Sequence, residues 1–135
     1  MKLSSLKLDL NAVEDGIILN LEEGASLRVA QWDNPAHLAF KRSLFKKYNK
    51  KIEAKMITDE ELQNHLDEEW VHIIRDMNGF EDFEYSPQAV VDLKRNPQFK
   101  AFFANVEKVS KDEKNYRVET IKSLGEDSLD SSNGQ

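Results

Sequence analysis

The chain has 135 residues, 39% of them hydrophobic and 33% charged, a composition that suits one folded domain with a heavily charged surface. It has no cysteine, which excludes disulfides, thiolate catalysis and cysteine-based zinc sites, and its net charge of -6 opposes general attraction to nucleic acid or anionic membranes. Because the first residues lack the apolar run of a signal peptide and no stretch approaches ~18 apolar residues, we expect no membrane segment and a cytoplasmic location.

Residues 1–32 predict short β-strands joined by tight turns. Apolar residues alternate with polar ones over 6–10, form a run over 17–21, and alternate again over 27–29. The glycine-containing segments 14–16 and 22–24 supply turn residues between them. We therefore expect a β-hairpin or small meander over 1–32, which is stable only when it packs on the rest of the chain.

Two long helices are predicted next. Asn34-Pro35 supplies an N-cap and a first-turn proline for a helix that reaches about Ala54. Apolar residues at helical spacing define its expected buried side, namely Leu38, Leu44, Phe45, Tyr48 and Ile52. A Thr58–Glu61 capping box begins the second helix. Its expected buried positions are Leu62, Leu66, Trp70, Ile73 and Met77, and Gly79 is its expected stop.

The remaining sequence predicts an aromatic, acidic loop over 79–85 and shorter helices after it. Ser86-Pro87 begins one helix, and Asn96-Pro97 ends it and begins the next. After Lys111 the pattern fits either a continuation of that helix or a separate one. The expected fold class is mainly α: a single domain over 1–124, with the β-hairpin region at 1–32 and about four helices over 34–124, followed by a disordered tail over 125–135.

No sequence motif predicts catalysis or nucleotide binding. There is no Gly-x-Ser-x-Gly elbow and no glycine-rich phosphate loop, so we expect neither an enzyme nor a bound cofactor. His65, Glu69 and His72 have the i, i+4, i+7 spacing that metal ligands on one helical face can show. Helical di-metal sites need a second Glu-x-x-His motif, which the sequence lacks, so we interpret the three as hydrogen-bonded residues beside the buried stripe and expect no metal.

The two predicted long helices carry opposite charges, the first basic and the second acidic. The residues that we expect at a contact between subunits are Lys41, Arg42, Lys46, Lys47, Lys50, Lys51, Asp59, Glu60, Asp67 and Glu68. Solvated faces or pairing within one chain are the simplest interpretation. A head-to-tail contact would instead build a ring or filament of identical subunits. Nucleic-acid binding by the basic helix 41–55 is a third interpretation, which the net charge disfavours.

Aromatic residues are concentrated in the loop 79–85 and in the helix after Pro97. Aromatics at helical spacing usually belong to the core, but some of these can line a groove for an amphipathic partner helix. The candidates for binding a client protein are Phe80, Phe83, Tyr85, Phe99, Phe102 and Phe103.

From Trp70 onward the sequence resembles the C-terminal half of tail assembly chaperones from long-tailed, siphophage-type bacteriophages or prophages. The shared features are an aromatic helix ending near Gly79, an acidic loop, Tyr85-Ser86-Pro87 opening a short helix, and Pro97-Gln98-Phe99 followed by Phe102-Phe103. Upstream, Asn34-Pro35 and a basic helix reaching Tyr48 are also similar to that family. The resemblance covers about Ala12 to Tyr116.

This resemblance implies a morphogenesis factor that binds the long helical tape-measure protein and keeps it soluble until tail-tube protein polymerises. It implies multimers in the cytoplasm of the bacterial host and absence from the mature virion. Some family members also have a longer, frameshifted form, for which the polar end of this chain is a plausible junction. The competing hypotheses are a helical nucleic-acid-binding or regulatory protein that uses the basic helix 41–55 and, more distantly, a metal-dependent enzyme centred on His65, Glu69 and His72.

Overall fold

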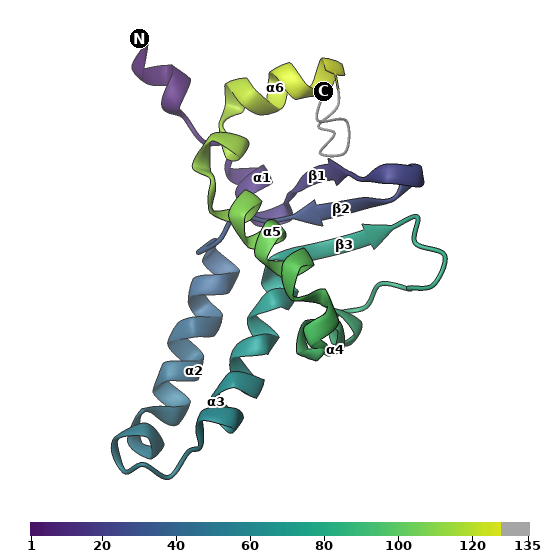
Figure 1. Ribbon diagram of the computed structural model, residues 1–135. Helices are drawn as coiled ribbons and strands as arrows, with labels where there is room; N and C mark the ends of the chain where they lie inside the picture. The colour runs from purple at the N-terminus through teal and green to yellow at the C-terminus, as the bar shows by residue number, and fades with distance from the viewer. Residues whose placement is uncertain (128–135) are drawn as a thin grey trace.

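A computed structural model of the protein describes residues 1–127, with the side chains of Ile52 and of residues 124–127 outside the description. The fold is mainly helical with a small three-stranded antiparallel sheet (Figure 1). Its α-helices are α1 (Leu10–Asp15), α2 (Pro35–Glu53), α3 (Asp59–Leu66), α4 (Pro87–Arg95), α5 (Lys100–Lys111) and α6 (Val118–Asp127). The strands are β1 (Ile17–Asn20), β2 (Ser26–Val29) and β3 (Ile74–Asn78). Turns of 3₁₀ helix cover Leu3–Leu6, Glu22–Gly24, Asp67–His72, Pro97–Phe99 and Glu113–Tyr116.

The sheet joins the predicted hairpin to a strand from the middle of the chain. β1 and β2 form the hairpin, with Leu19 opposite Leu27, so this part of the prediction is confirmed. β3 pairs antiparallel with the other edge of β2, where Leu27 faces Met77 and Val29 faces Ile74. The central strand is therefore β2, and it connects the two halves of the sequence.

The second long helix is shorter than predicted. The capping box forms as expected, with the Thr58 hydroxyl accepting from the Glu61 N–H at 3.1 Å, but α3 ends at Leu66. After the 3₁₀ segment Asp67–His72 the chain becomes β3. Ile73 and Ile74 are both fully buried, Ile73 just after the 3₁₀ segment and Ile74 as the first residue of β3. Their β-branched side chains favour the strand.

Gly79 ends a strand, whereas the sequence suggested that it ends a helix. Its φ is +80°, and an added Cβ would lie 2.5 Å from the carbonyl oxygen of Gly24. Only glycine therefore allows the end of β3 to approach the β1–β2 turn this closely.

The predicted strand over 6–10 is also wrong, because Asp9 begins a helix instead. Its carboxylate accepts from the N–H groups of Asn11 at 3.0 Å and Ala12 at 3.1 Å, which caps α1. Of the expected strand only a bridge between Leu8 and Arg117 remains. Gly16, at φ +101°, then turns the chain into β1.

Helix α2 has nearly the predicted length, but its buried face is only partly the predicted one. Tyr48 is buried and Leu44 half-buried, as expected, whereas the buried His37 was not expected. Leu38 and Phe45, both expected inside, are 38% and 64% exposed. The apolar stripe misled the prediction because the neighbouring segment presents polar partners to α2, which turn the polar residue His37 inward. The side chain of Ile52 lies outside the described residues.

Helix α4 begins where the sequence predicts, and Asn96-Pro97 begins a 3₁₀ turn, Pro97–Phe99, that leads into α5. Ser86 and Asn96 act as caps, accepting from the N–H groups of Ala89 and Gln98, each at 3.0 Å. Beyond α5 the chain forms the separate helix α6, which extends to Asp127 and so overlaps the first three residues of the predicted tail. Residues 128–135 of the predicted tail lie outside the described part of the chain.

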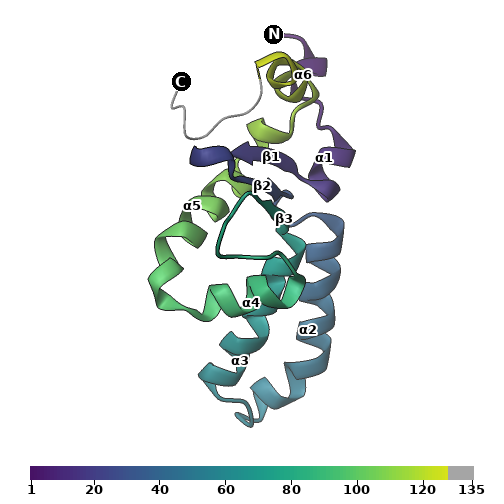
Figure 2. The ribbon, with the colours of Figure 1, turned by 90° about the vertical axis from the view of Figure 1, so that its right-hand side faces the viewer.

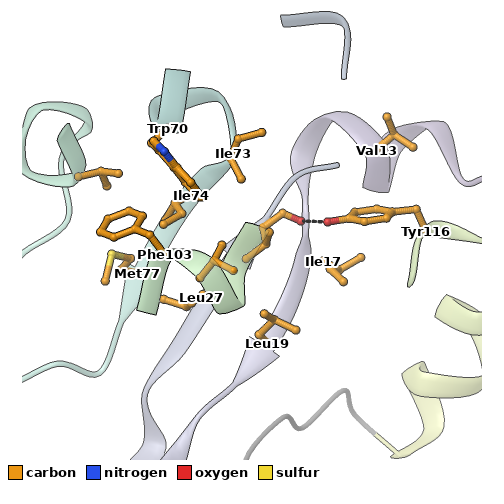
Figure 3. Packing of buried hydrophobic residues seen from close by; sticks show 13 residues of the cluster. Val13, Ile17, Leu19, Leu27, Trp70, Ile73, Ile74, Met77, Phe103 and Tyr116 are labelled. Carbon is orange, nitrogen blue, oxygen red and sulfur yellow. Dashed lines mark hydrogen bonds between the residues drawn. The ribbon is translucent and has the colours of Figure 1, made fainter. Parts of the chain in front are cut away.

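The hydrophobic core lies around the sheet. Thirteen buried residues form it, including Leu27 and Val29 of β2, Trp70, Phe103 and Tyr116 (Figure 3). The Tyr116 hydroxyl donates to the carbonyl oxygen of Val29 at 2.9 Å, and burial raises the pKa of this hydroxyl well above its usual range. None of the described side chains of α2 or α3 belongs to this cluster.

Helices α2 and α3 lie side by side and extend away from the sheet, as both ribbon views show (Figure 2). We call residues 34–66 the arm, and the sheet with α1, α4, α5, α6 and the 3₁₀ segment Asp67–His72 the body. None of the helices in the described part of the chain is long and apolar enough to cross a membrane.

Candidate protein-binding site

An apolar pocket of about 190 Å³ opens on the surface of the body beside β3. It lies between the loop 79–86 and the junction of α4 with α5. Its lining residues are Met77, Phe80, Asp82, Phe83, Leu93, Phe99 and Phe102. We call this the aromatic pocket.

The break between α4 and α5 positions one wall of the aromatic pocket. Pro97 lacks the N–H that would continue α4, and Asn96 caps the turn that follows. The chain therefore changes direction, which brings Leu93 from the end of α4 and Phe102 from α5 to the same pocket.

The loop 79–86 forms the other wall and is fixed at both ends. Gly79 packs against the turn at Gly24, and the Tyr85 hydroxyl donates to the carbonyl oxygen of Ile74 at 3.1 Å. Burial also raises the pKa of the Tyr85 hydroxyl above its usual range. Between these anchors the rings of Phe80 and Phe83 meet edge to face, with centroids 6.5 Å apart.

Four of the six aromatics singled out from the sequence line this pocket, namely Phe80, Phe83, Phe99 and Phe102. Phe103 does not, because it is only 2% exposed and packs on Trp70 with ring centroids 4.9 Å apart. Tyr85 anchors the loop instead.

The sequence analysis did not identify Met77, Asp82 and Leu93 as pocket residues. Met77 was assigned to the buried side of a helix that proved to be a strand. Leu93 could have been found, since it is the last apolar residue of α4 before the proline break.

Acidic residues border the aromatic pocket on the side of the loop 79–86. Asp82 is part of its wall, and two adjoining surface depressions that share Phe80 are lined by Glu22, Glu23, Glu81, Glu84 and Asp76. An apolar floor with acidic residues along one side fits an apolar side chain that is flanked by positive charges.

The basic residues predicted for self-association lie along α2, and some already have partners. Lys41 contacts Asp33 at 2.6 Å and lies over the ring of Trp32, while Lys47 and Lys51 lie over the ring of Tyr48. The predicted residues Arg42, Lys46 and Lys50 of the same helix are exposed.

The acidic residues predicted for self-association divide between surface and interior. Asp59 and Glu60 are exposed, and Glu68 lies 3.9 Å from His65. Asp67 is buried and contacts Lys94 at 3.4 Å, so it is not available at the surface as the sequence suggested. Within residues 1–127 no ion pair joins the cations of α2 to the acids of α3.

The possible metal ligands His65, Glu69 and His72 point to three different partners. His65 receives a hydrogen-bond contact from the Tyr48 hydroxyl at 2.7 Å, and His72 packs on Phe40 with ring centroids 5.3 Å apart. No group of three or more potential ligands gathers among the described residues. Burial, followed by the charge of Arg75, lowers the pKa of His72.

Glu69 binds His37, a partner that the sequence did not reveal. His37 is fully buried, and its Nδ1 accepts the Asp33 N–H at 2.9 Å. This hydrogen bond assigns the proton to Nε2, which lies 2.6 Å from the Glu69 carboxylate and donates to it. The two residues join the base of the arm to the body.

A comparison of the chain with protein-family models, curated proteins and solved structures finds no match in any of the three. The fold and the site thus define a small mainly helical protein with a three-stranded sheet and an acid-rimmed aromatic pocket.

Proposed function

We propose that the protein is a tail assembly chaperone of a long-tailed phage or prophage. In this proposal it binds an apolar helical segment of the tape-measure protein, keeps it soluble in the host cytoplasm, and releases it as tail-tube protein polymerises. It acts by reversible binding, without catalysis or a cofactor, and is not carried into the virion. The observation that carries the proposal is the open aromatic pocket, which gathers Phe80, Phe83, Phe99 and Phe102 at the surface.

The size of the pocket favours a protein ligand over a small molecule. Small-molecule sites usually have volumes of ~300–1,000 Å³, whereas the aromatic pocket has about 190 Å³. Such a volume suits one large apolar side chain projecting from a helix, which the helix-in-groove mode of recognition uses as an anchor. Two of its walls come from a fixed loop and a helix junction, so little ordering is needed on binding.

One such contact is weak, and this agrees with a chaperone that works as a multimer. Burying one leucine or phenylalanine side chain contributes ~1.5–3 kcal/mol. A long client with repeated apolar positions can occupy several pockets of one multimer, and linked weak contacts then give strong overall binding. Weak individual contacts also permit release during assembly.

The exposed cations of α2 support the competing proposal of nucleic-acid binding. Arg42, Lys46 and Lys50 form a positive face on the arm, but the acidic helix α3 runs beside it (Figure 1). Replacing Lys46 and Lys50 with Glu should abolish retention on DNA without altering the oligomeric state if this competitor is correct.

Co-expression with a tape-measure protein tests the chaperone proposal. We expect the wild-type protein to raise the soluble fraction of the tape-measure protein encoded next to it, and Phe99→Asp to lose this effect because it places a charge in the aromatic pocket. Leu10→Asp is the matched control, since Leu10 is 72% exposed on α1 and does not line the pocket.

Circular dichroism of both variants establishes that they fold. A client that is no more soluble with the protein than without it, or one that Phe99→Asp protects as well as the wild type does, contradicts the proposal.

A further inference from the structure

Helix α2 exposes a large apolar side chain. Phe45 is 64% exposed, and Leu38, two turns earlier on the same face, is also exposed. Single exposed apolar residues are ordinary on a surface, but the ring of Phe45 leaves most of its apolar area in contact with water in the free chain. Contact with another molecule would bury that area.

Positive charges flank Phe45 along the helix. Arg42 lies between Leu38 and Phe45 on the same face, and Lys46 lies one residue beyond Phe45; both side chains are exposed. We call Leu38, Arg42, Phe45 and Lys46 the arm knob. It combines one exposed ring with two exposed cations.

The arm knob and the aromatic pocket have complementary chemistry. The pocket offers the rings of Phe80, Phe83 and Phe99 to an incoming apolar side chain, and aromatic side chains pair favourably edge to face. Its rim carries Asp82 and Glu81, which match the cations beside Phe45.

We propose that the arm knob of one molecule inserts Phe45 into the aromatic pocket of a second copy of this chain. The two surfaces belong to different parts of one molecule, because no residue of α2 lines the pocket. The contact is therefore heterologous: each molecule offers a knob to one neighbour and a pocket to another, so the assembly grows as a closed ring or an open chain. In this contact the cations of α2 meet the acidic residues of the loop 79–86 of a neighbouring molecule, whereas the sequence suggested that they meet the acidic helix after Thr58.

This inference deepens the proposed function, although the contact itself does not depend on it. If a client side chain binds in the aromatic pocket, it competes with Phe45 of the neighbouring subunit. Self-association then keeps the pockets covered until a client is present, and client binding separates subunits. That second step rests on the proposed function, whereas the contact between copies can be tested without any client.

Complementation between two variants tests the contact. Phe45→Ser removes the knob and leaves the pocket intact, and Phe99→Asp blocks the pocket and leaves the knob intact. In sedimentation velocity the wild type should form assemblies larger than a dimer that dissociate as salt is raised. Each variant alone should be monomeric, and an equimolar mixture of the two should form a dimer, because one intact knob meets one intact pocket.

Leu10→Ser is the control for the loss of an exposed apolar residue and should assemble like the wild type. A wild-type protein that stays monomeric at its highest attainable concentration overturns the inference, as does a Phe45→Ser variant that assembles normally or a mixture that remains monomeric.

Cross-linking supplies a second readout that needs no change in either surface. The chain has no cysteine, so Asn49→Cys on α2 and Gln98→Cys beside Phe99 introduce single reactive sites. A short bismaleimide should join these two variants when they are mixed, and should join Ser43→Cys, on the opposite side of α2, much less. Equal yields for the two pairs contradict the proposed orientation.

Client solubility separates a failure of this inference from a failure of the proposed function. If Phe45→Ser assembles like the wild type while Phe99→Asp still loses the client, the contact between copies is wrong and the chaperone proposal stands. If the variants complement each other but no form protects the client, the contact stands and the chaperone proposal fails.

Discussion

The body and the arm of this molecule are held by different kinds of contact. The body buries a cluster of apolar side chains around the sheet, with Trp70, Phe103 and Tyr116 among the largest. In the arm, α3 buries no residue, and the described side chains that α2 buries are His37 and Tyr48, both of which form polar contacts across to other elements. Apolar burial stabilises without a required direction, whereas each polar contact depends on one partner. We therefore expect the arm to open at a lower free energy than the body unfolds.

Removing a core side chain from the body should lower the free energy of unfolding more than any other change considered for the two regions. Phe103→Ala removes a ring that is 2% exposed and should lower the free energy of unfolding by ~3–5 kcal/mol, measured by denaturant titration. Phe99→Ala is the matched control, since that ring is 38% exposed and lines the pocket. Equal losses for the two variants would show that Phe103 is not the core residue described here.

Removing one polar partner should open the arm without unfolding the body. Glu69→Ala leaves the buried His37 Nε2–H without an acceptor, which costs ~1–3 kcal/mol. Hydrogen exchange should become faster in the first turns of α2 and stay unchanged in β2. Glu68→Ala is the control, because Glu68 is exposed and its ion-pair contact with His65 is long, at 3.9 Å. Faster exchange in β2 as well would mean that arm and body unfold together.

The same chemical change in two helix caps compares the regions directly. Ser86 caps α4 in the body and Thr58 caps α3 in the arm, each through a hydroxyl that accepts a backbone N–H. Replacing either with Ala should cost about 1 kcal/mol. For Ser86→Ala the loss should appear in the main unfolding transition, whereas for Thr58→Ala it should appear in the hydrogen exchange of α3 with the main transition in place.

A smaller effect is expected from pH at the junction of arm and body. Burial lowers the pKa of His72 below 6.5, so the folded state binds this proton less readily than the unfolded chain does. The contribution of His72 to stability is therefore complete above pH 6.5 and declines as pH falls through the lowered pKa. His72→Gln should flatten the decrease in stability between pH 7.5 and 5, measured by thermal unfolding, and an unchanged slope contradicts the assignment.

The sequence predicted the parts of this fold whose signals are local. Turn glycines located the β1–β2 hairpin, and the pairs Asn34-Pro35, Ser86-Pro87 and Asn96-Pro97 located three helix starts. These signals need no knowledge of the rest of the chain, because a cap or a proline acts on its own turn.

Features that depend on distant partners were not predictable in the same way. The spacing of Trp70, Ile73 and Met77 fits a helix, but pairing with β2 makes the last part a strand. The burial of His37 depends on Glu69, 32 residues away. The phenylalanines of the aromatic pocket could be proposed from the sequence because they are aromatic. That Phe102 lines the pocket while Phe103 lies in the core could not, because it depends on the packing of Phe103 against Trp70.

The pairing of Val29 with Ile74 has a further consequence for how this architecture can vary. Those two residues are adjacent in the sheet, so the chain leaves the body and returns to it at a single place. Whole turns could be deleted from or added to both helices between them without displacing either end, since the cost of closing a longer loop rises only slowly with its length. The reach of α2 can thus be adjusted while the pocket stays fixed, and in the assembly that we propose this would also set the spacing between successive molecules.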